Sequence, residues 1–326
     1  MEVNLMKKKV KKTEDKKISK TPVKVEELKL DTVLDSLIKG YGKETSEENK
    51  KSFSTTFLRY LKQEMTKDNN ASKYNILVLF DNTVLVKGDS DQIYRAVTGF
   101  SDTTKPILLI LLSGGGEPGS AYLIGKLCRE FSNSNKLVIV VPRHAKSAAT
   151  LLACAADEIH MGSLSELGPI DPQINRMPAL GLKNSIEHIA DLVSKNPGSS
   201  QMFAKYLELT VEPVQIGYYE RVAESAVQYP ERLLEKHKST LASEPAIIAN
   251  KLVYGYKDHG FVIDKEEAIS VFGDKTVKCN TPEYEIGNTI YNILLRVENI
   301  ADILDHNFYF IGSLDSSPNF VKKRKR

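Results

Sequence analysis

Four short, mostly apolar runs separated by helix-like stretches constrain the fold of this chain more than any other feature. The runs occupy residues 74–80, 106–112, 136–141 and 158–161. The stretches between them space their apolar residues as helices do: 90–99, 119–131 and 148–156. The runs lack the alternation of a strand that faces water on one side, so we predict strands buried on both faces. An α/β fold with a mostly parallel sheet and helices outside follows.

The charge of the chain is divided unevenly between its ends and its middle. The net charge is +3, from 45 Lys and Arg against 42 Asp and Glu. Residues 1–24 carry +6 and residues 322–326 carry +5, which leaves −8 for the residues between them. We predict that residues 1–24 form a disordered basic tail. Both basic ends could contact an anionic surface or nucleic acid by charge alone, although solvated disorder is the commoner explanation of such charge runs.

Composition shifts along the chain predict its organisation. A helical N-terminal extension is expected over 25–72, before the first predicted strand. The strands and site motifs place a catalytic domain at 73–277, which includes a mostly helical stretch at 182–243 and a small strand and helix at 261–277. Residues 278–326 are expected to form a C-terminal helix and a basic tail.

Several classes of protein are disfavoured by composition. The longest apolar run, 106–112, is far shorter than the roughly 20 residues of a membrane-spanning helix. The basic N-terminus is not followed by an apolar core, so it does not resemble a secretory signal. The three cysteines form no CxxC pair, which argues against zinc or disulfides. We expect a cytoplasmic protein, with peripheral contact to a membrane as an option.

A glycine-rich turn ends the second predicted strand, at residues 113–116. Glycines allow backbone amides to approach a ligand closely, and the next helix begins directly after them. The loop therefore suits an anion or the oxyanion of a carbonyl under attack. It is not a nucleotide-binding P-loop, because Leu127 follows Gly125-Lys126 where that motif has Ser or Thr. A simple tight turn is the alternative.

Ser147 lies between the third predicted strand and an alanine-rich helix. A nucleophile often occupies such a strand-to-helix turn, although the GxSxG context is missing. The commoner role for a serine here is to cap the helix. Because parallel strands end at one edge of a sheet, Ser147 and the glycine loop would together offer a hydroxyl and backbone amides, as acyl transfer requires.

These motifs resemble those of Clp-type proteases and, more closely, the serine dehydrogenase proteinase family of the ClpP/crotonase superfamily, which is related to signal peptide peptidase A. The resemblance covers roughly residues 74–275. The segments that carry it are Ser113–Ala121, Lys146–Ile159, Met161–Gln173, Gly217–Tyr229 and His259–Asp264.

The resemblance implies a ClpP/crotonase-like fold and a serine endopeptidase. It makes Ser147 the nucleophile and the backbone amides of Gly115 and Ala148 the oxyanion hole, with Gly116 and Asp171 lining the active site. Asp171 stands where Clp-type proteases have their histidine, so an unmodified Ser-His-Asp triad is not expected. As a turn residue between prolines, Asp171 could also serve only to cap backbone.

The general base is left open by the sequence. Signal peptide peptidases use a lysine from further along the chain, and a desolvated lysine can accept the serine proton. Lys183 is the preferred candidate, because it is nearest in sequence to the Asp171 segment. The other candidates are Lys195, Lys205, His188 and His259.

The leading hypothesis is therefore an ATP-independent serine peptidase that cleaves a polypeptide and forms a homo-oligomer. A crotonase-like acyl-CoA enzyme shares the two-amide oxyanion hole, but Ser147 at the nucleophile position argues against it. A non-catalytic scaffold of the same fold is the third hypothesis, because the base is undetermined. No cofactor or metal is expected, and no dinucleotide fingerprint that would indicate NAD is visible.

Overall fold

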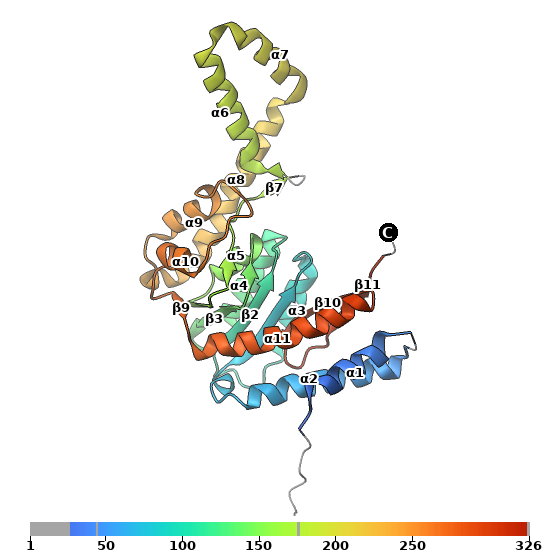
Figure 1. Cartoon of the computed structure of the whole chain (residues 1–326). Coiled ribbons are helices and arrows are strands. Elements are labelled where there is room, and N and C mark those ends of the chain that lie inside the picture. Colours follow the sequence, from blue (N-terminus) through green and yellow to red (C-terminus); the bar gives the residue numbers. More distant parts are fainter. Residues whose placement is uncertain (1–26, 44, 175–176, 325–326) are drawn as a thin grey trace, which may run out of the picture.

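The computed structural model describes residues 27–43, 45–174 and 177–324, and the predicted tail at 1–24 lies outside them. Its centre is a sheet with the strand order β11-β10-β1-β2-β3-β5-β9 (Figure 1). The four predicted strands are all present, and each pairs in parallel with the next. They are β1 (Asn75–Asp81), β2 (Ile107–Ser113), β3 (Leu137–Val141) and β5 (Glu158–Met161). The predicted α/β fold is confirmed.

Helices cover both faces of the sheet. One face packs against six helices: α3 (Lys87–Thr98), α4 (Pro118–Glu130), α5 (Ala148–Ala153), the end of α8 (Pro213–Leu234), α9 (Pro245–Tyr254) and α10 (Lys265–Phe272). Strand β9 (Val277–Cys279) is the edge strand next to β5. The other face packs against α1 (Leu30–Tyr41), α2 (Glu47–Thr66) and α11 (Pro282–Ile303).

The covering of the sheet by helices on both faces explains the apolar runs of the sequence. In β1, Leu77 and Leu79 belong to the first core, while Val78 and Phe80 belong to the second. Successive side chains of a strand point to opposite faces, so a strand covered on both sides must be apolar at every position. All seven residues of β1 are buried.

The C-terminal segment differs from the predicted basic tail. After α11, the chain forms β10 (His306–Ser313) and β11 (Asn319–Lys322). Strand β10 pairs antiparallel with β1, and β11 pairs antiparallel with β10. Lys322, the first of the terminal basic residues, is therefore the last residue of β11 and belongs to the main sheet. The N-terminal helices and this hairpin share one core, so both extensions are built into the body of the protein.

A helical arm projects from the body, as Figure 1 shows. It consists of α6 (Ala179–Lys195), α7 (Ser200–Thr210) and the first part of α8, and confirms the helical prediction for this stretch. A short hairpin, β7 (Gln173–Ile174) and β8 (Met177–Pro178), precedes it. Helix α7 contains no buried residue. Within the described part of the chain, no helix is both long and apolar enough to cross a bilayer.

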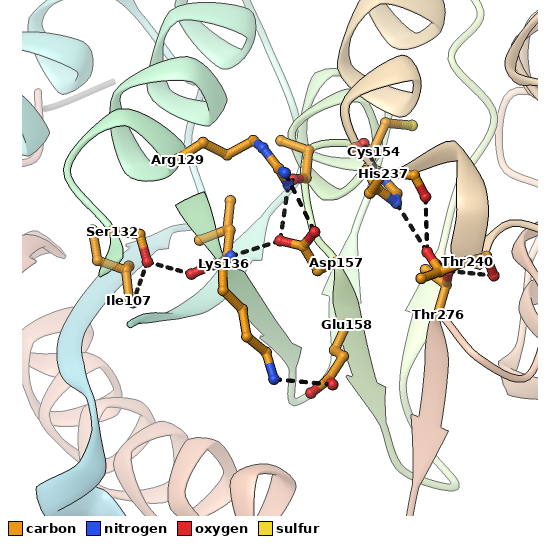
Figure 2. A network of polar contacts seen from close by, with 12 residues as sticks. Ile107, Arg129, Ser132, Lys136, Cys154, Asp157, Glu158, His237, Thr240 and Thr276 are labelled. Carbon is orange, nitrogen blue, oxygen red and sulfur yellow. Dashed lines mark hydrogen bonds and ion pairs between the residues drawn. The ribbon is translucent and has the colours of Figure 1, made fainter. Parts of the chain in front are cut away.

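A polar network ties together the elements at the amino ends of the strands (Figure 2). Arg129 of α4 donates to both carboxylate oxygens of Asp157, at 2.9 and 3.3 Å. Asp157 also accepts the Leu137 N–H at the start of β3, at 2.8 Å. The His237 ring, in the short helix Glu235–Thr240, lies 3.0 Å from the Cys154 carbonyl oxygen. These bonds satisfy buried polar groups on the side of the sheet opposite the candidate site.

Glu158 of β5 gives this part of the fold a testable pH dependence. Its contact with His160, together with Lys136, lowers the pKa of the Glu158 carboxyl from 4.5 to about 2. A depressed folded-state pKa stabilises the fold above pH 4.5, and that stability is lost as pH falls toward 2. We expect Glu158→Gln to remove roughly 1 kcal/mol of unfolding free energy at pH 6 and much less at pH 3. Urea denaturation at both pH values, with the exposed Glu130→Gln as a control, measures this; an equal loss at both would contradict it.

Candidate active site

The glycine loop and Ser147 meet at the carboxyl edge of the sheet. The two-residue strand β4 (His144–Ala145) continues alongside β2, with Ala145 opposite Ser113. The Lys146 N–H donates to the Ser113 carbonyl oxygen at 3.0 Å. A third short strand, β6 (Glu166–Leu167), lies parallel to β4 on its other side. The prediction that two strand ends come together here is therefore confirmed.

Ser147 adopts a backbone conformation that non-glycine residues rarely occupy. Its φ is 51° and its ψ is −116°, directly before the first residue of α5. Its side chain forms no cap hydrogen bond with the helix, and the residue is half-buried. The helix-cap role that the sequence favours is therefore not seen. Strained residues on a strand-to-helix turn are typical of nucleophiles, whose side chain must project from the sheet edge.

Gly115 lies directly against Ser147. A Cβ atom at Gly115 would come within 2.6 Å of the Lys146 carbonyl oxygen and 2.8 Å of the Ser147 Cβ. Gly115 also has a φ of 97°, in the left-handed region that favours glycine. Both the close approach and the backbone conformation require glycine at this position.

Some backbone N–H groups around Ser147 donate a hydrogen bond within the protein, and others do not. The Gly115 N–H donates to the Ser113 hydroxyl at 3.1 Å. Among the described residues, the N–H groups of Gly116 and Ala148 have no protein acceptor. The neighbouring bonds explain this for Gly116: Leu85 pairs with the Gly115 carbonyl and the Glu117 N–H, both at 2.9 Å, and leaves the Gly116 N–H unused. Ala148 begins α5, where a helix has no acceptor for its first amides.

Two supporting hydroxyls were not singled out from the sequence. Ser113, which is fully buried, holds the Gly115 amide. Thr150 of α5 donates to the Ala145 carbonyl at 2.6 Å and accepts the Gly168 N–H at 3.1 Å, which joins α5 to both β4 and the residue after β6. A buried serine and threonine carry no distinctive sequence signal, because their roles depend on pairing across the sheet.

The lysine and histidine candidates on the arm are all exposed: Lys183, Lys195, Lys205 and His188. Lys183 lines a cavity of about 200 Å³ between α6, α8 and α9, together with Tyr219, Glu220 and Tyr254. Lys146, next to Ser147, is held elsewhere: its Nζ lies 3.2 Å from both the Leu167 carbonyl oxygen and a Glu166 carboxylate oxygen.

Asp171 and His259 form a pair beside this edge. Asp171 is 7% exposed, and its Oδ2 lies 3.7 Å from the His259 Nδ1. Burial raises the pKa of the Asp171 carboxyl, opposed in part by His259 and by a 2.9 Å hydrogen bond from Gln173. Asp171 Oδ1 and His259 Nδ1 are buried without a hydrogen-bond partner. The structure thus brings together two residues that the sequence placed in separate candidate roles.

The residues that the structure describes contain no group of three or more His, Cys, Asp or Glu side chains placed to hold a metal ion.

Residues 77–196 match the sequence model of a family described as the ClpP-like SDH-type serine proteinases. The predicted family resemblance is confirmed. The match includes the glycine loop, Ser147 and Asp171, and supports a serine peptidase as the class of protein. The arm beyond residue 196 and both terminal extensions lie outside it.

The chain is also similar to two uncharacterised proteins of Methanocaldococcus jannaschii. One is 29% identical over 195 residues, which cover 60% of this chain and 61% of the relative. The other is 33% identical over 106 residues, or 32% of this chain and 35% of the relative. The alignments therefore span less than two thirds of each relative.

Two solved structures, both of variants of the 1510-N membrane-bound stomatin-specific protease, are similar as well. One is 15% identical with a TM-score of 0.41, and covers 70% of this chain and 86% of that chain. The other, in complex with a substrate peptide, is 14% identical with a TM-score of 0.41, and covers 77% of this chain and 89% of that chain.

Proposed function

We propose that this chain is a serine endopeptidase with Ser147 as its nucleophile. One observation carries the proposal: Ser147 occupies a strained turn at the sheet edge, leaves its helix uncapped and lies against Gly115. Strain costs about 1–3 kcal/mol and persists where function requires it. A structural serine at this position would cap α5 without such strain.

The oxyanion hole is proposed to include the Ala148 amide, as the resemblance implies, together with an amide of the glycine loop. The Gly116 N–H suits this role better than that of Gly115, because the Gly115 N–H already donates to Ser113. Amides that need no reorganisation stabilise a tetrahedral intermediate strongly, and losing one donor typically costs about 10²–10³ in rate.

In the proposed reaction, Ser147 Oγ attacks a peptide carbonyl carbon while a base takes the hydroxyl proton. The tetrahedral intermediate collapses, the C–N bond breaks, and the leaving amine receives that proton. Water then attacks the acyl carbonyl carbon as the base takes its proton, the Oγ–C bond breaks, and Ser147 Oγ receives that proton, which frees the carboxylic acid product. We propose that turnover needs no ATP, because the Gly125-Lys126-Leu127 segment lacks the hydroxyl residue of a phosphate-binding loop.

A polypeptide substrate and self-association complete the proposal. The arm supports association with a second copy of the chain, because it exposes large apolar side chains. Among them are Met202 at 63% exposure, Leu209 at 78% and Val214 at 81%. Such exposed patches typically mark interaction sites. The oligomeric state can be measured by sedimentation.

A fluorophosphonate reagent tests the nucleophile directly. We expect the native protein to gain one adduct, mapped by peptide mass spectrometry to Ser147, because only an activated serine displaces fluoride from phosphorus. Ser185 and Ser194 on the exposed face of α6 serve as internal controls, and urea-unfolded protein should not react. A folded protein without an adduct, or with equal adducts on the α6 serines, would overturn the proposal.

A further inference from the structure

A cavity lined by basic side chains lies beside the polar network at the amino ends of the strands, away from Ser147. Its volume is about 520 Å³. It is bordered by the second half of α4, the loop between α5 and β5, and the junction of α8 with the short helix Glu235–Thr240. The residues that line it are Tyr122, Lys126, Arg129, Glu130, Ser134, Asp157, Arg232, Leu233 and Lys236. The proposed peptidase reaction uses none of these side chains.

The lining of this cavity carries an excess of positive charge. Four of its side chains are cationic and two are carboxylates. One carboxylate, that of Asp157, already accepts hydrogen bonds from Arg129 on both oxygens, at 2.9 and 3.3 Å. Among the residues that the structure describes, Lys126, Arg232 and Lys236 form no ion pair with a carboxylate. Three cations without an ion-pair partner therefore line a single cavity.

This concentration of positive charge contrasts with the charge of the surrounding protein. Residues 25–321 carry a net charge of −8, so the body as a whole repels anions. Neighbouring cations in a concave site repel one another, and an anion that binds between them relieves this repulsion. The charge distribution thus indicates an anion site confined to this cavity, and not a basic surface spread over the body.

The packing of α8 against α4 forms the cavity. Helix α4 contributes Lys126 and Arg129, which are three positions apart and therefore share one face of the helix. Gly125 beside them allows α8 to approach, because a Cβ there would lie only 3.6 Å from Leu233 Cδ2. The end of α8, which carries Arg232, thus forms the other wall.

Arg129 is held rigidly at the base of this site, as Figure 2 shows. Its Nη1 donates to the Ala155 carbonyl oxygen at 2.7 Å and to Asp157 at 2.9 Å, and the side chain is only 12% exposed. A guanidinium has more N–H donors than its three bonds to Ala155 and Asp157 use. Arg129 can therefore donate to a bound anion without changing its position.

The size and lining of the cavity favour an organic phosphate as the ligand. Pockets for small organic molecules typically enclose about 300–1,000 Å³, and a phosphate ion alone would fill only a small part of this one. A phosphate monoester carries a charge of about −1.5 to −2 at pH 7, which matches the excess of cations over carboxylates. Arg and Lys are the side chains that proteins use to bind phosphate, while Leu233 and Tyr122 add apolar surface for an organic body.

We propose that this cavity binds a small organic molecule through a phosphate monoester group. The basic side chains of α4 and of the end of α8 contact the phosphate oxygens, and Leu233 and Tyr122 contact the organic part of the ligand. The site is separate from Ser147 and does not depend on the proposed peptidase function. Binding can therefore be measured on the full-length protein without an assay of peptide cleavage.

Isothermal titration calorimetry at low ionic strength tests the ligand class. The probes are AMP, glucose 6-phosphate and phenyl phosphate, each compared with its dephosphorylated form and with inorganic phosphate. We expect at least one ester to bind with a Kd below about 1 mM, and its dephosphorylated form and inorganic phosphate to bind at least about tenfold more weakly. Absence of binding by all three esters at about 10 mM would overturn the proposal. Inorganic phosphate that binds as tightly as every ester would overturn the assignment to an organic molecule.

Substitutions of opposite charge effect test the location of the site. Arg232→Gln and Lys126→Gln should each weaken binding of the ester by about tenfold, the usual effect of losing a hydrogen bond between charged groups. Glu130→Gln should instead tighten binding by about threefold, because it removes the carboxylate that opposes the cations. Lys51→Gln, an exposed change on α2 at the other face of the sheet, alters the net charge as Lys126→Gln does and should have no effect.

The basic ends of the chain are the competing source of phosphate binding. Residues 1–24 carry a charge of +6 and residues 322–326 carry +5. Binding at these ends would be the same in the wild type, Arg232→Gln and Glu130→Gln, and that result would overturn the proposal even if the esters bind. All three substituted positions of the cavity are exposed, so we expect the variants to fold, which circular dichroism checks.

Discussion

Replacing Ser147 with glycine is expected to abolish peptidase activity and to raise the free energy of unfolding by about 1 kcal/mol. Its φ of 51° and ψ of −116° are strained for a residue with a side chain. Glycine adopts such angles freely, so the substitution should release about 1–3 kcal/mol of strain. The greater entropy of glycine in the unfolded chain offsets about 0.5–1 kcal/mol of that gain.

Ser147→Ala is the matched control, because alanine removes the hydroxyl and keeps the Cβ that causes the strain. Both variants should lose at least about 10⁴-fold in activity, and only the glycine variant should gain stability. Urea denaturation and peptide cleavage measure the two effects. Equal stability of the two variants would show that the turn is not strained, and activity in either would exclude Ser147 as the nucleophile.

Part of the candidate site could be predicted from the sequence, because it is built from residues that are adjacent in the chain. The proposed catalytic site depends on local features: glycines at 115 and 116, and a serine followed by alanines. Such features can be recognised from neighbouring residues in the sequence, and so can strands that are buried on both faces. The sheet order near the site follows from them, since each helix returns the chain to the next parallel strand.

Contacts between segments that are distant in the sequence cannot be recognised in this way. The pairing of Asp171 with His259 depends on the bridge between Leu167 and Ile263, with the whole arm inserted between the two segments. Sequence proximity favours Lys183, which lies exposed near the start of α6, beside the cavity that α6 shares with α8 and α9. Whether it serves as the base stays a prediction, because proximity along the chain does not determine which side chains meet in the fold.

The C-terminal hairpin is not apparent from the sequence for a related reason. The basic residues at 322–326 suggest a tail, yet β10 is apolar at Phe308, Phe310 and Ile311, which are all buried. Strand β10 is stabilised by β1, which pairs with it, and by α2, which packs against its Phe308 and Phe310 side chains. Its partners lie more than 200 residues earlier, so local composition does not reveal the pairing.

This arrangement makes the N-terminal helices part of the same folded body as the candidate active site, which a second substitution with a large effect can test. Phe57 of α2 is fully buried, and its ring lies 5.6 Å from that of Phe53, 5.6 Å from Phe310 and 6.4 Å from Phe308. Phe57→Ala removes these contacts and leaves a cavity between α2 and the sheet. We expect it to reduce the free energy of unfolding by about 3–5 kcal/mol.

The form of the unfolding transition decides between two architectures. If α1 and α2 share one core with the sheet, Phe57→Ala should lower the midpoint of a single transition, followed both by circular dichroism and by labelling of Ser147. Phe57→Leu should cost less than about 1.5 kcal/mol, and the exposed Thr55→Ala on the same helix should have almost no effect. If the helices were a separate extension, part of the helical signal would be lost early, while labelling of Ser147 would persist to the wild-type midpoint. Because β10 joins α2 to β1, we expect the single transition, with the candidate active site lost together with the N-terminal helices.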